Sequence, residues 1–454
     1  MQTNDMLKVN YMAGKRKLRI VFSVVLSDAG EATRALEIAN GIKDYCPDNY
    51  ELNIIFLSNG SKFEQKVVYN GFKIHKCLPV LPGVGFRQDL KPTKTNLIGD
   101  MKLAGELLRG EVHAFIELKP DVVIHGFYPI ASLARRMVNN PILGICYLPI
   151  PLQENIFAST LMKDIPDVIK PLTYLPLRLR RKIIKLIPKS LKMRAPIFKQ
   201  SNIIKALDEF KWNKEPINNL FDMLRADLTI INDFKEFYKD DILPDNYKIV
   251  GPLYAPASNN IEIDKNILNI FNRENERLKI FCTLGSSGEK QCLFEVMKAL
   301  NQGIGKNWSA VILAPEAVCP IDEAKAYAGS NPNIYLTDSF VPAPLVNSLA
   351  DIVISHGGQG TIQTAIASGT PVVGFAMQPE QQINLDNIVI RGAGIRIPIN
   401  RWSSHNIQSS VNRIIRKPSY RENMRTLKNI LNSINGRKNS AFAIWDYMLK
   451  KLPK

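Results

Sequence analysis

The sequence contains no apolar run long enough to span a bilayer. The run nearest the N-terminus, IVFSVVL at 20–26, stops before Ser27, whereas crossing a membrane takes about 20 residues. This run follows the basic stretch GKRKLR, but no clean small-residue cleavage site comes after it, so we expect no signal peptide. We therefore expect neither a membrane-spanning nor a secreted protein.

Cysteine and histidine are scarce and scattered. The six cysteines lie among apolar neighbours without a CxxC spacing, which indicates reduced thiols in a cytosolic protein rather than a disulfide framework. The five histidines are dispersed, so the sequence predicts no zinc site. Small folds that depend on disulfides or on zinc are thereby excluded.

Acidic residues are missing from one segment in which cations gather. The chain has 59 basic and 42 acidic residues, a net charge of +17, and residues 170–200 hold ten Lys or Arg and no acid. Leu179, Ile183, Leu186 and Ile187 recur there at helical spacing, which predicts a basic amphipathic helix. Such a helix either lies on an anionic membrane surface or packs on its own domain, and the sequence leaves both open. The expected location is cytoplasmic, either free or peripheral on the inner membrane face.

A nucleic-acid partner is not expected despite this charge. No aromatic residues interleave with the cations to form a base-stacking platform, and the sequence has no DNA- or RNA-binding motif.

The rest of the sequence alternates short apolar runs with amphipathic stretches. LRIVFSVVL (18–26), DVVIHGF (121–127) and ILGICYL (142–148) predict buried strands, and EATRALEIANGIKDY (31–45) predicts a helix. Near-continuous apolar strands joined by helices are typical of a parallel sheet covered on both faces. The predicted fold class is α/β, with two facing Rossmann-like, doubly wound parallel-sheet domains and a cleft between them.

Composition also predicts the domain boundaries. GPLYAPASNN, rich in Pro, Ser and Asn, is typical of a linker, and the strand–helix pattern restarts after it. We predict an N-terminal domain at 1–248 with a basic insertion at about 150–220, a linker at 249–260, a second domain at 261–435 and a final helix at 436–454.

The stretch SHGGQGTIQTAIASGTP, between the runs DIVI and PVVGF, predicts an anion site. Open α/β sheets bind ligands at the carboxyl ends of their strands, where His356 would lie. The glycines, Gly358 and Gly360 among them, let the backbone turn sharply and approach a ligand. A helix beginning near Thr361 would offer unpaired N–H groups and a positive dipole end to a phosphate, and the histidine could donate to it. The alternative is that these glycines satisfy only the geometry of a turn.

Further polar and small residues follow other strand ends. Glu380 and Gln381, after PVVGF, offer a carboxylate and an amide that suit neighbouring sugar hydroxyls. TLGSSG supplies a second small-residue turn with Ser286 and Ser287, and SFVPAPLV could border a flat base.

SFVP, HGGQGT, SGTPVVGF and PEQQ together resemble the donor-binding region of family-one glycosyltransferases, the UDP-glycosyltransferases of the GT-B fold. GEATRALEIA at 30–39 is similar to the start of that family's N-terminal domain. The resemblance covers nearly the whole chain and is most specific in the C-terminal half. It implies an inverting enzyme that moves a sugar from a UDP-sugar bound in the second domain to a hydroxyl of an acceptor bound in the first.

The resemblance also implies roles for single residues. His356 would contact the diphosphate, while Glu380 and Gln381 would hold the hydroxyls of the donor sugar. The last helix would pack back on the N-terminal domain. The other donor-side residues would lie beside the diphosphate or the uracil: Gly358, Gly360, Thr361, Ser286, Ser287, Phe340, Val341 and Pro342.

Two positions depart from the family pattern. Thr364 stands where the family often has a ribose-binding glutamate, and Glu31, after Gly30, stands where it usually has its catalytic histidine. A carboxylate is a weak general base unless burial raises its pKa. The base therefore stays open among Glu31, Asp28 and His125, which ends the strand DVVIH and should face the cleft.

The implied mechanism needs no metal and no cofactor, because a helix dipole and His356 would stabilise the departing diphosphate. The insertion mixes Leu, Ile and Pro with cations, which favours a lipophilic small molecule or a lipid as acceptor. Two alternatives remain. One is a catalytically inactive nucleotide-sugar-binding partner subunit, which the missing histidine favours, and the other is a nucleotide-sugar epimerase, which needs no acceptor.

Overall fold

The structure is a computed structural model of the 454-residue chain. It describes residues 15–26, 29–61, 63–157, 161–192, 198–239, 242–254, 262–272, 276–285, 288–339 and 341–452.

The first half of the chain forms a parallel sheet with the strand order β3-β2-β1-β4-β5-β6-β7. Its strands are β1 Arg16–Ser23, β2 Tyr50–Ser58, β3 Lys73–Lys76, β4 Val122–His125, β5 Leu143–Leu148, β6 Leu228–Ile231 and β7 Tyr247–Ile249. Its helices are α1 Ala29–Asp44, α2 Glu64–Tyr69, α3 Phe86–Leu90, α4 Met101–Leu118, α5 Pro129–Met137, α6 Glu154–Ile156, α7 Leu177–Leu186, α8 Lys189–Lys192, α9 Ser201–Glu209 and α10 Leu220–Met223. We call this half the N-terminal lobe.

The second half repeats the arrangement in the order β10-β9-β8-β11-β12-β13, again parallel throughout. Its strands are β8 Leu278–Thr283, β9 Trp308–Leu313, β10 Ile334–Thr337, β11 Ile352–Ser355, β12 Val372–Gly374 and β13 Gly394–Arg396. Its helices are α11 Lys265–Asn272, α12 Lys290–Asn301, α13 Ile321–Ala328, α14 Ala343–Leu349, α15 Gln359–Ser368, α16 Pro379–Val389, α17 Ser404–Ile415 and α18 Ser419–Asn432. We call this half the C-terminal lobe.

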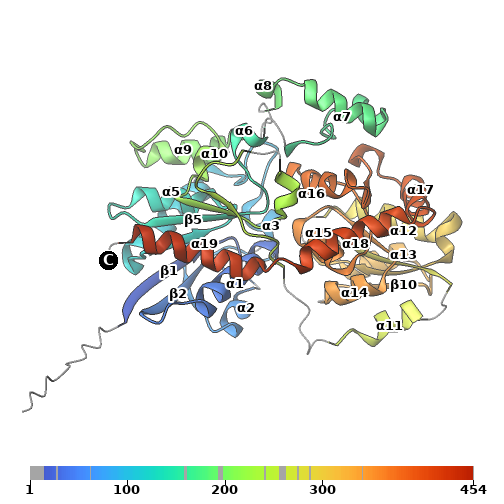
Figure 1. The fold of residues 1–454 in the computed structure, drawn as a ribbon, viewed down its shortest axis with the longest axis horizontal. Helices are drawn as coiled ribbons and strands as arrows, with labels where there is room; N and C mark the ends of the chain where they lie inside the picture. The colour runs from blue at the N-terminus through green and yellow to red at the C-terminus, as the bar shows by residue number, and fades with distance from the viewer. Residues whose placement is uncertain are drawn as a thin grey trace, which may run out of the picture.

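The strands are apolar because helices cover both faces of each sheet, as Figure 1 shows. Ile20, Val21 and Phe22 of β1 are all fully buried, although successive residues point to opposite faces. The predicted fold class of two doubly wound parallel sheets is confirmed. The long helix α4 begins at Met101, because the Asp100 side chain caps it by accepting from the Lys102 amide at 3.0 Å.

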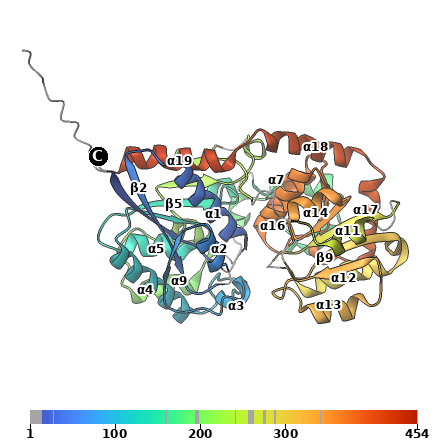
Figure 2. The same cartoon turned by 90° about the horizontal axis from the view of Figure 1, so that it is seen from below.

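The final helix, α19 (Gly436–Lys451), leaves the C-terminal lobe and packs on the N-terminal one, as Figure 2 shows. Its Trp445 is buried and donates from Nε1 to the Ile42 carbonyl at 3.1 Å. Arg437 pairs with Asp44 at 2.6 Å at the start of the same helix. The predicted linker lies partly outside the described residues, since 255–260 are not among them.

The insertion between β5 and β6 crosses in the opposite direction. Leu161 and Ile165 belong to a hydrophobic cluster that also contains Ile383 and Leu385 of α16. Arg396 of β13 anchors this contact in a set of buried ion pairs, which we call the Arg396 cluster: Nη2 to Asp164 at 2.6 Å, Nη1 to Asp167 at 2.5 Å and Nε to Asp386 at 2.8 Å. Two segments besides the linker therefore join the lobes: the insertion, which packs on the C-terminal lobe, and α19, which packs on the N-terminal lobe.

The predicted basic helix exists as α7, but its apolar residues do not share one environment. Ile183 and Ile187 pack against the hydrophobic cluster of the insertion, whereas Leu179 and Leu186 are 44% and 80% exposed. The inward face is instead completed by Ile184 and by Arg180, whose guanidinium pairs with Asp164 at 3.0 Å. The expectation of a single apolar face was thus wrong, because a buried ion pair takes part of that face.

Among the described residues, no helix combines the length and apolar character needed to cross a membrane. All six cysteines are free thiols.

Candidate active site between the two sheets

The glycine-rich loop after β11 is shaped by close packing at its first positions. Gly357 has a φ of 85°, and a Cβ there would lie 2.6 Å from the Gln381 carbonyl oxygen. A Cβ on Gly358 would lie 2.8 Å from the ring of His356, which is itself buried. Only glycine fits either position, so this part of the loop is dictated by the protein itself.

The next glycine is different, because a Cβ on Gly360 would meet no heavy atom within 4 Å. Gly360 lies in the first turn of α15, and the N-cap residue, Gly358, has no side chain with which to cap the N–H groups of that turn. The first turn of this ten-residue helix, where the anion site is predicted, therefore has open space beside Gly360, and His356 lies two residues before the N-cap.

The start of α16 is tied to the same loop. Asn384 donates from Nδ2 to the Gly357 carbonyl at 3.1 Å and also to the Glu380 carboxylate. Gln381 is buried, and its Oε1 accepts from the Met377 amide at 2.9 Å. The structure thus places Glu380 and Gln381 beside the loop that follows His356.

The turn after β8 completes this edge of the second sheet. Gly285 has a φ of 58°, and a Cβ there would lie 2.7 Å from Cε1 of His356, so the two loops meet at the imidazole. Ser286, Ser287 and Phe340 lie outside the described residues. Val341 is buried in a hydrophobic cluster of the C-terminal lobe, so its side chain packs inward.

Thr364, where the family often has a glutamate, is engaged within the protein. Its hydroxyl donates to the Thr361 carbonyl at 3.0 Å and accepts from Asn347 Nδ2 at 3.2 Å. Thr364 therefore braces the first turns of α15 instead of presenting a free carboxylate.

In the N-terminal lobe, Glu31 lies in the first turn of α1 and is nearly buried. Its Oε1 accepts from Arg34 Nη2 at 2.8 Å, and Arg34 Nη1 in turn donates to Gln359 Oε1 at 3.3 Å. Because Gln359 is the first residue of α15, this chain of contacts sets the candidate base opposite the predicted diphosphate site.

Gln359 also binds the loops that follow two strands of the first sheet. Its Nε2 donates to the Pro149 carbonyl at 2.5 Å and to the Asn232 carbonyl at 3.0 Å, and Gln363 donates to the same Asn232 oxygen at 2.8 Å. The carboxyl edges of the two sheets therefore meet at α15. The sequence analysis did not single out Gln359, although its position between two glycines of the motif was a usable signal.

His125 does not face the other lobe, contrary to the expectation from its strand-end position. The side chain is fully buried, and Nδ1 lies 2.9 Å from the Gly126 carbonyl oxygen. Burial lowers the pKa of His125 to about 4, so the imidazole is neutral at pH 7. The strand-end position was misleading because β4 is an inner strand of the sheet, and the space beyond Gly126 is filled by Glu31. Asp28 lies outside the described residues.

A further carboxyl group at this edge was missed. Asp233 follows β6, is buried, and accepts from the Tyr238 hydroxyl at 2.5 Å. The pKa of Asp233 is raised to about 7, mainly by burial and to a smaller extent by the nearby charge of Glu380. A polar pair, Asn232 and Asp233, directly after the apolar run LTII was the signal that sequence reasoning passed over.

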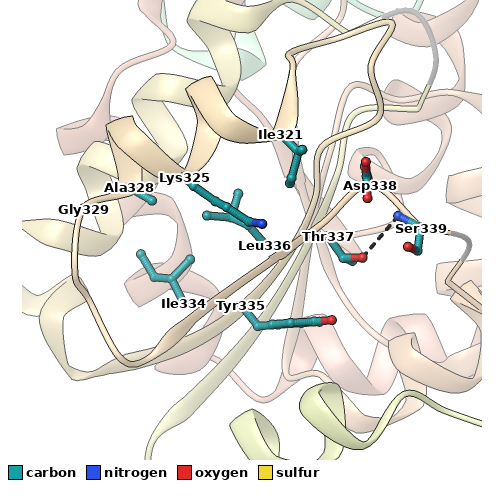
Figure 3. Close-up of a pocket in the computed structure, with 10 residues that line it drawn as sticks. All are labelled: Ile321, Lys325, Ala328, Gly329, Ile334, Tyr335, Leu336, Thr337, Asp338 and Ser339. Carbon is teal, nitrogen blue, oxygen red and sulfur yellow. Dashed lines mark hydrogen bonds between the residues drawn. The ribbon is translucent and has the colours of Figure 1, made fainter.

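A surface depression of about 420 Å³ lies beside β10 and α13, and Figure 3 shows the side chains that line it. Its lining includes Thr337, whose Oγ1 accepts from the Ser339 amide at 3.1 Å. Two strands, β9 and β8, separate β10 from β11 in the sheet, so β10 lies roughly 14 Å from the strand that leads into the glycine loop. None of the residues of the glycine loop lines this depression. Within the described part of the chain, no three His, Cys, Asp or Glu side chains gather as a metal site would require.

Comparison with known proteins agrees with this geometry. Residues 310–434 match the family described as erythromycin biosynthesis protein CIII-like, C-terminal domain. The chain is 18% identical to a glycotransferase of kitacinnamycin of known structure, with a TM-score of 0.62 over 96% of this chain and 100% of that one. The chain therefore has the GT-B fold of glycosyltransferases.

Curated relatives carry the comparison further. A PGL/p-HBAD biosynthesis rhamnosyltransferase of Mycobacterium bovis (strain BCG / Pasteur 1173P2) is 21% identical over 90% of this chain and 83% of its own length. A PGL/p-HBAD biosynthesis glycosyltransferase of Mycobacterium tuberculosis (strain ATCC 25177 / H37Ra) is 26% identical, and the chain spans less than half of its length, 44%. These matches make the chain a homologue of proteins that are named as glycosyltransferases.

Proposed function

We propose that the protein is an inverting glycosyltransferase that moves a sugar from a UDP-sugar to a hydroxyl of a lipophilic small molecule or a lipid. One observation carries the proposal: the open first turn of α15 at Gly360, flanked by His356, lies directly across from the Glu31–Arg34 pair. A site for a departing diphosphate and a candidate base for the acceptor thus lie on facing edges of the two sheets.

On the donor side, the N–H groups at the start of α15 and the His356 imidazole would stabilise the negative charge that develops on the diphosphate. Glu380 and Gln381, fixed beside the same loop, would hold the hydroxyls of the sugar. This route assigns no step to a metal ion, and we expect activity to persist in EDTA.

On the acceptor side, the hydroxyl would transfer its proton to the Glu31 carboxylate as its oxygen attacks the anomeric carbon. The bond from that carbon to the diphosphate oxygen breaks on the opposite face, so the configuration inverts. Arg34 holds the carboxylate in place at 2.8 Å and ties it to α15 through Gln359. We infer that Arg34 positions Glu31 when the lobes meet.

The nature of the acceptor and its approach are also part of the proposal. The relative aligned over most of the chain is named for PGL/p-HBAD biosynthesis and for rhamnose, so activated deoxyhexoses and lipophilic acceptors belong in the first panel tested. We expect the segment 170–200, with its ten cations, to make peripheral contact with a membrane. The free thiols favour a reducing, cytoplasmic location.

The test is a screen of UDP-glucose, UDP-GlcNAc and activated rhamnose against lipophilic acceptors, read by nucleotide release and product mass. We expect Glu31→Gln to lower kcat by about 100-fold or more, as loss of a general base does, with little change in the donor KM. His356→Ala should raise the donor KM and lower kcat, whereas Glu51→Gln, an exposed residue of β2, should match the unmodified protein.

Two outcomes would contradict the proposal. Donor binding without turnover across the panel would favour the partner-subunit alternative, for which the missing first-turn histidine is the argument. Conversion of the donor sugar in the absence of any acceptor would favour the epimerase.

A further inference from the structure

The outer face of α7 combines cations with leucines. Arg178, Lys182 and Lys185 are exposed at spacings of four and three residues. Leu179 and Leu186, seven residues apart, lie on the same face and are 44% and 80% exposed. This face has no carboxylate, since residues 168–192 contain no Asp or Glu.

Apolar side chains beyond α7 are exposed in the same segment. Val168 is 87% exposed, Tyr174 is 67% exposed and Leu191 is 49% exposed. We call these three residues and the outer face of α7 the basic–apolar surface. Single exposed apolar residues are ordinary, but five within 24 residues, interleaved with cations, are not.

The inner side of the same segment is firmly held. Arg180 donates from Nη1 to the Thr173 carbonyl at 3.2 Å and pairs with Asp164, while Ile184 is buried. Asp164 in turn belongs to the Arg396 cluster. Leu179 and Leu186 therefore stay exposed in the folded protein, because other residues of α7 already occupy its buried face.

Asp164 and Ile165, just before the basic–apolar surface in the chain, contact α16, the helix that carries the proposed sugar-binding residues. Gln382, next to Gln381 in α16, donates from Nε2 to the backbone carbonyls of Asp164 and Ile165 at 3.2 and 3.3 Å. Figure 1 shows α7 and α8 at the periphery of the molecule, on the side where α16 lies. A partner with a flat surface that bound the basic–apolar surface would therefore lie on the same side of the protein as α16.

We propose that the basic–apolar surface docks on an anionic lipid bilayer. Cations on a helix attract anionic headgroups, worth about 1 kcal/mol for each Lys or Arg near the surface, and exposed leucines enter the boundary between headgroups and acyl chains. An acidic protein would satisfy the cations but would leave side chains as protruding as Val168 and Leu186 without use. The docking deepens the proposed function, since it brings a lipid acceptor to the protein, but vesicle binding itself does not depend on catalysis.

The experiment is flotation of the full chain with vesicles of phosphatidylcholine alone or with about one third phosphatidylglycerol. We expect binding to the anionic vesicles only, and a steep loss when salt is raised from about 0.1 M to 0.5 M, because surface charges are then screened. Lys182→Glu/Lys185→Glu should lower the partition coefficient by about 30-fold or more, the equivalent of two lost cation contacts.

The leucines have their own variant and control. Leu179→Ser/Leu186→Ser should reduce binding by about tenfold or more while leaving the salt dependence of the remainder intact. Ile304→Ser/Lys306→Glu, which changes an exposed apolar residue and an exposed cation on the C-terminal lobe, should bind as the unmodified protein does. Unchanged far-UV circular dichroism and melting would show that each variant folds.

Three results would overturn the proposal: no binding to anionic vesicles, equal binding of all the variants, or a leucine variant that binds vesicles and polyglutamate as well as the unmodified protein does. The last result would indicate an acidic macromolecule as the partner. If no glycosyl transfer is found but vesicle binding follows the predicted pattern, the proposed function fails and the docking surface stands.

Discussion

Gly357 and Gly360 lie three residues apart, the first in the loop after β11 and the second in the first turn of α15, and their surroundings differ. At Gly357 the backbone has a positive φ, and any Cβ would run into the Gln381 carbonyl. At Gly360 the backbone is helical and the space beyond the Cα is empty of protein. Glycine at 357 therefore serves the fold, whereas no contact around the Cα of residue 360 requires a glycine there.

Substituting each glycine by alanine separates these needs. Gly360→Ala should hold or raise the melting temperature, since alanine is favoured over glycine in a helix by about 1 kcal/mol, and should raise the donor KM. Gly357→Ala should lower the melting temperature because of its positive φ and the clash. Calorimetry and UDP titration measure both effects. Unweakened UDP binding in Gly360→Ala would show that the nucleotide lies elsewhere.

Glu111 is a buried carboxyl group that the proposed reaction does not use. It lies in α4 and accepts from the Ser23 hydroxyl at 2.7 Å. Burial raises the pKa of Glu111 to about 8, against a smaller lowering by its hydrogen bonds from Ser23 and Tyr128. In the folded protein the group is therefore protonated at pH 7, whereas in the unfolded chain it is ionised.

This difference makes the stability depend on pH. Between the unfolded pKa near 4.5 and the folded value near 8, the folded state holds the extra proton, so the free energy of unfolding falls as pH rises, by up to about 1.4 kcal/mol per pH unit. Glu111→Gln should flatten this slope in urea titrations at several pH values. Glu117→Gln, exposed on the same helix, should keep it. Parallel curves for Glu111→Gln and the unmodified protein would show that Glu111 ionises normally.

At the scale of elements, the insertion between β5 and β6 connects the two lobes. It contributes Asp164 and Asp167 to the Arg396 cluster and packs Leu161 and Ile165 against α16. A buried guanidinium among three carboxylates is stable only as a set, because each charge would be costly alone.

Removing the shared cation should therefore be severe. Arg396→Leu leaves Asp167 and Asp386 without their counter-ion and leaves Asp164 with Arg180 alone, and we expect a loss of about 3–5 kcal/mol in the free energy of unfolding, measured with urea. Arg413→Leu, an exposed arginine of α17, should change the stability by less than about 0.5 kcal/mol. A similar small effect in both variants would mean that the cluster contributes nothing.

The elements were predictable from the sequence where their pattern was local. The apolar runs predicted the parallel strands, and the glycine motif predicted a strand, a turn and a helix at β11 and α15. The outer leucines of α7 were misassigned because nothing local shows that Arg180 would turn inward to Asp164. A charged residue on an apolar face is normally a sign that the face is solvated.

At the scale of the whole molecule, the sequence predicted the fold class but not how the two sheets touch. The contact of Arg34 with Gln359 joins residues 325 positions apart, and hydrophobic periodicity in the sequence does not predict contacts between such distant residues. His125 shows the same limit, since its strand-end position was evident from the sequence and its complete burial was not. Lobe contacts depend on tertiary packing, which single-sequence patterns do not contain.

The final helix offers a test at this scale. Trp445→Ala should lower the free energy of unfolding by about 3–5 kcal/mol, because a buried indole in the N-terminal core and its bond to the Ile42 carbonyl are both lost. Leu449→Ala, on an exposed position of α19, should have a small effect. Equal melting temperatures for the two variants would show that α19 is not part of the N-terminal core.

The Arg396 cluster also bears on how this protein can be re-engineered. A chimaera that keeps the first half and takes a foreign second half, with its crossover in the linker, would bury Asp164 and Asp167 opposite a surface not built to neutralise them. A workable exchange would have to transplant the segment around Asp164 together with the second half, which requires additional crossovers. Under the proposed function, sugar preference would therefore be better altered by point changes around α16 than by swapping halves.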